Sequence, residues 1–233
     1  MEKTIQIKDL SCDLCGTGKE NRVIYMIYPE VAEFKSGWLS RQADKYGVAI
    51  VMIYIPANQW NNYLTPWPEP GEEPDCPPFE GKASEFLSIL LNEIMPRAEM
   101  ELNLSPDVER DMMGVSLSGL FTLWQWMTCD KFLSIASLSG SFWFNGFIDW
   151  FDSKVSSTHK QGRAFFLLGN EEPRSRVKAF RPVGENTEKI VDQLSASGTK
   201  VEFVWVPGNH FTDPLGRAEK GLQFLATGAN TSE

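Results

Sequence analysis

Histidine and cysteine are scarce in this chain of 233 residues, which has two histidines and four cysteines. Basic residues are also few: 22 Lys and Arg stand against 31 Asp and Glu, and the net charge is −9. Binding to nucleic acid or to anionic lipid needs a basic surface, so neither partner is expected. No apolar run reaches the roughly 20 residues that span a bilayer. The charged start MEKTIQIKDL lacks the apolar core of a secretory signal, which favours a cytoplasmic location.

The four cysteines do not form a recognisable metal or redox site. Cys12 and Cys15 form a Cys-x-x-Cys in SCDLCG, whereas Cys76 and Cys129 are isolated. Zinc would need a second pair or nearby histidines, and a redox role would need a thioredoxin-like setting. The glycine-rich loops that cradle nucleotides are absent as well. We therefore expect inert thiols near an N-terminal turn, no metal and no cofactor.

Short apolar runs alternate with segments of helical spacing along the chain. Several runs are apolar on both faces, which is typical of strands in a parallel sheet that is covered on both sides. The order predicts an α/β protein with a doubly wound, mostly parallel sheet and helices on both faces. We expect one domain over 1–233, with 1–21 as an N-terminal edge segment and no large lid domain. The expected strands are 22–29, 47–56, 111–116, 132–140, 163–169 and 200–208.

Three helices can be placed from periodicity and end signals. Apolar side chains share one face over 82–102, where Pro96 should kink or end the helix. A second helix covers 187–194, and Gly198 is its candidate C-terminal stop. The third begins after Asp213, a candidate N-cap that precedes a proline.

Ser116 stands in GVSLSG, between an expected strand and an expected helix. A nucleophilic serine needs this position, because a tight strand-to-helix turn exposes its oxygen at the carboxyl end of the sheet. The helix N-terminus then directs free N–H groups at developing negative charge. Gly114 is small, as the crowded turn requires, whereas Ser118 stands where the Gly-x-Ser-x-Gly pattern has its second glycine.

His210 and an adjacent pair of glutamates supply the other groups that a catalytic serine needs. The expected order along the chain is nucleophile, acid, histidine. His210 directly follows the last expected strand, whereas His159 lies in a polar stretch and is expected at the surface. Glu171 and Glu172 follow the preceding strand, and a carboxylate there can accept the second N–H of the histidine. The residues alone leave open which glutamate does so.

Five separated blocks of the chain occur in the order of a known family: 58–70, 114–124, 137–144, 167–176 and 206–221. In these blocks the sequence resembles small bacterial esterases of the α/β-hydrolase fold, related to enterobactin-type siderophore esterases and to esterase D-like proteins. The resemblance implies that Ser116 is the nucleophile and His210 the base. It also aligns Asn170 and Glu172 with the Gly-Asp-x-Glu loop of the family, which favours Glu172 over Glu171.

Backbone N–H groups near the strand ends are expected to complete the site. An oxyanion hole needs two such donors. We expect Leu117, directly after the serine, as one donor. The other should be Trp60 or Asn61, in the Pro- and Trp-rich stretch 57–81, which is expected to be a long connection after a strand.

Tryptophan is abundant, with eight copies. Trp67 and Trp143 stand past strand ends and are expected to form aromatic walls of a substrate pocket. Trp205 falls inside the last expected strand, where we expect it in the core.

Together these residues predict a serine hydrolase that cleaves a carboxylic ester of a small molecule through an acyl-enzyme. Two alternatives remain: an acyltransferase that uses the same triad, and a hydrolase-fold binding protein without catalysis. The relatives suggest a lactone or an aryl ester, but the sequence identifies neither the natural substrate nor the oligomeric state.

Overall fold

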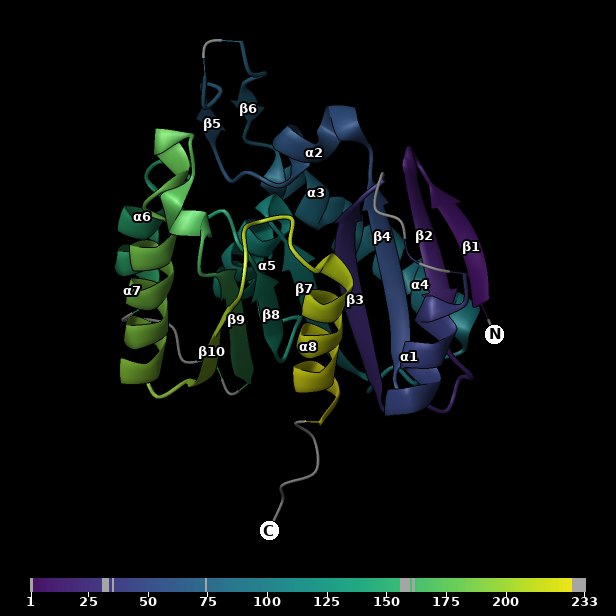
Figure 1. Ribbon diagram of the computed structural model, residues 1–233. Helices are drawn as coiled ribbons and strands as arrows, with labels where there is room; N and C mark the ends of the chain where they lie inside the picture. Colours follow the sequence, from purple (N-terminus) through teal and green to yellow (C-terminus); the bar gives the residue numbers. More distant parts are fainter. Residues whose placement is uncertain are drawn as a thin grey trace.

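The computed structural model describes residues 2–30, 34, 36–73, 75–155, 160 and 162–227. An eight-stranded sheet with the order β1-β2-β4-β3-β7-β8-β9-β10 runs through the molecule (Figure 1). Neighbours from β4 to β10 are parallel, whereas β1 and β2 are antiparallel additions at one edge. The predicted α/β class with a mostly parallel sheet is confirmed. The strands are β1 (Glu2–Ile7), β2 (Leu10–Cys15), β3 (Arg22–Pro29), β4 (Ala49–Ile55), β7 (Glu109–Val115), β8 (Ile135–Leu138), β9 (Arg163–Gly169) and β10 (Lys200–Val206).

Helices cover both faces because the central strands are apolar on both sides, as in β3, where every residue before Pro29 is buried. On one face α1 (Trp38–Tyr46) and α8 (Pro214–Thr227) pack against the sheet, where Leu39 and Leu222 join Met26 and Met52 in one cluster. Among the described helices, none is long and apolar enough to cross a membrane. The other face carries α3 (Ala83–Ile89), α4 (Met95–Leu102), α5 (Leu117–Thr128), α6 (Phe147–Val155) and α7 (Val183–Ala196).

The end signals at Gly198 and Asp213 are confirmed, although the second helix, expected over 187–194, covers Val183–Ala196. Between α3 and α4 the chain forms a π-helical turn over Leu90–Ile94, and Pro96 lies in the first turn of α4. Proline has no N–H to donate and crowds the preceding turn, so the wider π turn accommodates it. α7 ends before Gly198, which has φ 88°. Asp213 caps α8 by accepting the N–H of Gly216 at 3.1 Å.

The centre of the sheet is formed by β3 and β7, which are direct neighbours with Ile27 paired to Gly114. The chain runs outward from β3 to β4 and then crosses back to β7, so the strand order reverses between β3 and β7. In open α/β sheets, ligands bind beyond the carboxyl ends of the strands at such a reversal. In Figure 1 this end of the sheet carries α2 (Ala57–Tyr63) and the hairpin of β5 (Pro68–Glu69) and β6 (Phe79–Glu80).

Three sequence expectations are corrected by the fold. Cys12 and Cys15 do not lie at a turn, because they are buried in β2, which pairs with β4. The stretch 57–81 contains α2 and the β5–β6 hairpin, so it is more than a connection. Trp205 is 40% exposed because β10 is an edge strand, where a neighbouring strand covers only one side.

Candidate active site

Ser116 occupies the turn between β7 and α5, with φ 59° and ψ −124°. A serine seldom adopts a positive φ, and such strain persists only where the surrounding structure enforces it. Two backbone hydrogen bonds hold Ser116 in this conformation. The Ser116 N–H donates to the Leu138 carbonyl (3.0 Å), and the Ser141 N–H donates to the Ser116 carbonyl (3.0 Å). The turn therefore holds a partly exposed serine at the carboxyl end of β7.

Residues on either side of Ser116 are constrained by close packing. A Cβ atom on Gly114 would lie 2.2 Å from the Ser118 carbonyl oxygen, so a larger residue cannot replace this glycine without movement. Ser118 is fully buried. Its hydroxyl accepts the N–H of Val115 and donates to the carbonyl of Ile27, both at 2.7 Å. This hydroxyl thus ties the start of α5 to the ends of both central strands.

His210 and Glu172 come from the ends of neighbouring strands and meet through a hydrogen bond. Nδ1 of His210 lies 2.8 Å from Oε2 of Glu172. Glu172 begins a short 3-10 helix after β9, and His210 lies between β10 and α8. With the carboxylate ionised, Nδ1 donates its proton to this bond and Nε2 carries a free lone pair. A general base requires this arrangement.

Burial by itself raises the pKa of the Glu172 carboxyl, but its hydrogen bonds together hold that pKa below the ordinary value. His210 has the largest lowering effect, followed by the Ser139 hydroxyl and the backbone N–H of Gly169. These last two donate to Oε1 at 2.7 and 2.8 Å. A carboxyl with a lowered pKa stays ionised at neutral pH, so Glu172 acts as an acceptor.

The loop that carries Glu172 is fastened to the loop that carries His210. Asn170 Oδ1 accepts the N–H of Gly208 at 3.1 Å, and the Glu171 N–H donates to the Gly208 carbonyl at 3.1 Å. Glu171 itself is exposed. The structure therefore places Glu172, and not Glu171, against the histidine.

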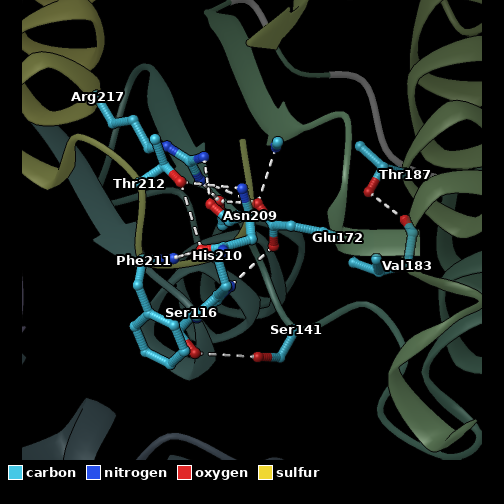
Figure 2. A network of polar contacts seen from close by, with 12 residues as sticks. Ser116, Ser141, Glu172, Val183, Thr187, Asn209, His210, Phe211, Thr212 and Arg217 are labelled. Atoms are coloured by element: carbon cyan, nitrogen blue, oxygen red, sulfur yellow. Dashed lines mark hydrogen bonds and ion pairs between the residues drawn. The ribbon is translucent and has the colours of Figure 1, made fainter. Parts of the chain in front are cut away.

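Ser116 lies beside this pair but is not bonded to it. In Figure 2 the imidazole of His210 lies between the Glu172 carboxylate and Ser116. The partner of Ser116 Oγ is Ser141 Oγ at 3.4 Å, and within the described part of the chain no hydrogen bond joins Ser116 to His210. Without substrate, catalytic hydrogen bonds are often long or misaligned. The other histidine, His159, lies outside the described residues.

Three residues of the site escaped the sequence analysis. Ser139 contacts Glu172, and Ser141 contacts Ser116. Both lie in the run Ser-Gly-Ser at 139–141, directly after β8, and a serine–glycine run past a strand end was a usable signal. The third, Arg217, is buried in α8 and forms an ion pair of 2.9 Å with Glu172. Nothing in the spacing of one arginine in a helix indicated this contact.

Leu117 lies at the start of α5, whereas Trp60 and Asn61 lie inside α2. Leu117 is the first residue of α5, so its N–H has no acceptor within the helix. Trp60 and Asn61 are the fourth and fifth residues of α2, where N–H groups bond within the helix. In addition, β4, which leads into α2, is not the neighbour of β7; β3 is. The structure gives no support to Trp60 or Asn61 as the second donor, and the order of the strands favours the chain that follows β3.

An aromatic groove of about 270 Å³ lies between the β5–β6 hairpin and the segment after β8. Phe79, Trp143 and Phe144 line it together with Pro70, Ala179 and the acidic residues Glu69 and Glu72. Trp143 comes two residues after Ser141, so the groove begins on the segment that contacts Ser116. This position suits a pocket for an apolar or aromatic group.

Trp67 is held at the base of the hairpin. Its ring packs near those of Phe144 and Trp150, with centroids 5.8 and 6.3 Å away. Its Nε1 donates to the Asn145 carbonyl at 3.0 Å. The structure thus gives Trp67 a packing role next to the groove, where it fastens the hairpin to the segment after β8.

The molecule has another cavity, whose lining does not include Ser116, Glu172 or His210. A cavity of about 590 Å³ at the amino end of β7 is lined by charged side chains that include Asp107, Arg110 and Lys160. Across the described residues, no group of three or more His, Cys, Asp or Glu side chains is placed to hold a metal ion.

Sequence comparison gives one family and a relative of moderate similarity. The model of the Esterase family, described as "Putative esterase", matches residues 31–203. The uncharacterized protein YbbA of Bacillus subtilis (strain 168) is 30% identical over 154 residues. That match covers 64% of this chain and 60% of the relative.

Solved structures with the same fold include two hydrolases. Siderophore hydrolase EstA from Aspergillus nidulans superposes with a TM-score of 0.76 at 18% identity, covering 97% of this chain and 93% of EstA. An IroE-like serine hydrolase from Shewanella oneidensis gives 0.77 at 17% identity, covering 97% of this chain and 79% of that protein. At these identities the likeness shows the fold alone, which is that of the α/β-hydrolases. Because the family match covers most of the chain, this protein belongs to the Esterase family.

Proposed function

We propose that this chain is a serine hydrolase that cleaves carboxylic esters of small molecules through an acyl-enzyme. The observation that carries the proposal is the 2.8 Å contact of His210 with Glu172 beside Ser116, a serine at positive φ on a strand-to-helix turn. Membership of the Esterase family supports ester hydrolysis as the reaction class. The four free cysteines suit a reducing compartment, and we propose the cytoplasm.

In the proposed reaction, Ser116 Oγ attacks the ester carbonyl carbon while Nε2 of His210 takes the hydroxyl proton. Glu172 accepts the Nδ1–H and stabilises the imidazolium that forms. The Leu117 N–H binds the oxyanion of the tetrahedral intermediate, and a second donor is expected from the chain after β3. The imidazolium then gives its proton to the leaving alcohol. Water repeats the cycle, so that the acid is released and Ser116 regains its proton.

Labelling with a fluorophosphonate probe tests the nucleophile. The probe should label the wild-type chain and fail to label Ser116→Ala. Ser141→Ala is the matched control, because Ser141 Oγ lies 3.4 Å from Ser116 Oγ and is the other hydroxyl within reach. Labelling of Ser116→Ala, or its loss only in Ser141→Ala, would show that the wrong serine has been assigned.

The same assay separates the two alternatives. Folded wild-type protein that takes no label would be a binding protein on a hydrolase fold. Label together with ester products formed from an added alcohol, in place of free acid, would indicate an acyltransferase.

For the substrate we propose an ester or lactone that carries an aromatic group. The groove lined by Phe79, Trp143 and Phe144 supports this, since aromatic walls favour flat apolar groups. A panel of p-nitrophenyl and naphthyl esters with aliphatic or aromatic acyl groups tests it: equal kcat/KM across the panel would contradict the proposal.

A further inference from the structure

Arg217 is the one buried cation at the candidate site among the described residues, and the proposed reaction does not use it. It lies in the first turns of α8, 5% exposed, on the opposite side of Glu172 from the histidine (Figure 2). A buried guanidinium is costly unless its charge and its N–H groups find partners. Its partners therefore indicate what it does.

The guanidinium of Arg217 contacts Glu172 directly and reaches the His210 loop through the backbone of Asn209. Nη1 donates to Glu172 Oε1 at 2.9 Å and to Ser139 Oγ at 2.6 Å. Nη2 donates to the carbonyl of Asn209 at 2.7 Å, and Asn209 is the residue directly before His210. One planar group thus holds the acid and the backbone of the histidine loop in a fixed relation.

Oε1 and Oε2 of Glu172 have different partners as a result. Oε1 accepts from Arg217 Nη1, from the Ser139 hydroxyl and from the Gly169 N–H at 2.9, 2.7 and 2.8 Å. Oε2 has His210 Nδ1 as its partner at 2.8 Å. With three donors on Oε1, the carboxylate cannot rotate without breaking all of them, so Oε2 stays directed at the imidazole.

Gly169 is packed so closely against Arg217 and Glu172 that no side chain fits at this position. A Cβ atom there would lie 2.7 Å from Arg217 Nη2 and 2.9 Å from Glu172 Oε1. It would also lie 2.4 Å from the Gly208 carbonyl oxygen. A side chain at this position would therefore force the guanidinium and the carboxylate apart.

We infer that Arg217 is a positioning residue, which orients Glu172 and the His210 loop towards each other and offsets the carboxylate's charge. The inference rests on the proposed roles of His210 and Glu172. Charged groups that face Glu172 from the surrounding elements are His210, from the loop after β10, and Arg217, from α8. Glu171 and Arg174, the charged residues close to Glu172 in the chain, are exposed.

Replacement of Arg217 by methionine removes the positive charge and leaves Glu172 with His210 as its only cationic partner. The full negative charge then acts on the imidazole, so the pair should hold its proton to higher pH. We expect the titration midpoint of His210 to rise by about one pH unit. The acid limb of the kcat/KM profile should move in the same direction, because His210 must be unprotonated to act as base.

NMR titration of the imidazole signals measures this shift without any turnover. The chain has two histidines, so His159→Gln assigns the signals. Arg163→Met is the matched control: Arg163 also anchors α8, through the Phe224 carbonyl at 2.6 Å, but does not contact Glu172. The control should leave the His210 midpoint within about 0.3 unit of wild type, since no charge next to the pair changes.

A folded Arg217→Met protein with an unchanged His210 midpoint would overturn the inference. If Arg217→Met does not fold, Arg217→Lys tests the inference. Lysine keeps the positive charge but lacks the planar, two-pronged geometry of the guanidinium. We expect an unchanged midpoint and a kcat about tenfold lower at constant KM, whereas wild-type kcat would overturn the inference. Failure of Ser116 to take the fluorophosphonate label would instead refute the proposed function. The NMR result would still show whether Arg217 acts on the His210–Glu172 pair.

Discussion

Glu172 Oε2 lies 2.8 Å from His210 Nδ1, although 38 residues separate the two in the chain. The contact forms because β9 and β10 are parallel neighbours, so the loops after both strands emerge at the same edge of the sheet. The Glu172 side chain is 5% exposed and both of its oxygens are hydrogen-bonded, whereas the His210 side chain is 32% exposed. An ionised acid behind a partly accessible base is the arrangement on which the proposed chemistry depends.

Replacement of Glu172 by glutamine should lower kcat by about 100-fold or more with little change in KM. The amide cannot stabilise the imidazolium, and it leaves Arg217 without its counter-charge. Glu171→Gln is the matched control. Its kcat should stay within about twofold of wild type, since the charge of an exposed carboxylate is largely screened by solvent. Steady-state kinetics on a p-nitrophenyl ester measures both; a larger loss in Glu171→Gln would reverse the assignment of the acid.

Ser118→Ala should destabilise the protein while leaving its chemistry nearly intact. The change deprives the Val115 N–H and the Ile27 carbonyl of their partner, which costs about 1–3 kcal/mol of unfolding free energy for buried groups. Because the hydroxyl bonds to the strand ends and not to Ser116, kcat should fall by less than about threefold. Urea denaturation and kinetics on the same preparation test this: lost activity at unchanged stability would place Ser118 in the chemistry.

Trp143→Ala should weaken the binding of aromatic esters selectively. Loss of a groove wall that also packs on Phe180, with centroids 4.4 Å apart, should raise KM for a naphthyl ester by about tenfold. KM for p-nitrophenyl acetate should change little, since its acyl group is small. Trp205→Ala, on the edge strand, controls for the general loss of a tryptophan; the same KM rise in both variants would argue against the groove as the pocket.

Cys12 and Cys15 should resist thiol reagents in the native protein. Burial raises the pKa of both thiols, that of Cys12 to about 12, so at pH 8 the thiolate fraction of Cys12 is on the order of 10⁻⁴. Cys76 is partly exposed and should react first with a thiol-reactive dye. Mass spectrometry of peptides labelled before and after unfolding in urea measures the order, and rapid native labelling of Cys12 would contradict the buried position in β2.

Local patterns of the sequence were enough to predict the strands around Ser116 and some of the helix ends. The runs at 22–29 and 163–169 match β3 and β9 residue for residue, because strands buried on both faces are apolar throughout. Pro96 and Asp213 marked helix boundaries through their own backbone chemistry. Trp205 escaped the same reasoning, because an edge strand and a central strand share one pattern and differ only in their neighbours.

The second oxyanion donor shows most directly that local sequence patterns do not reveal which strands are neighbours in the sheet. The expectation of Trp60 or Asn61 took the donor from the stretch after the strand expected at 47–56. The sheet instead places β3 beside β7 and β4 beyond it, so the strand order in space differs from the order in the chain.

Sequence patterns alone predicted the α/β class, the serine at the strand-to-helix turn and the positions of His210 and the glutamate pair past strand ends. These features are local, since periodicity, turn residues and motif spacing act over a few neighbouring residues. Three contacts became visible only in the folded chain: Glu172 faces His210, Ser118 bonds to Ile27, and Arg217 reaches Glu172 from α8. Side-chain direction and strand adjacency arise from packing between segments far apart in the chain, which no local pattern records.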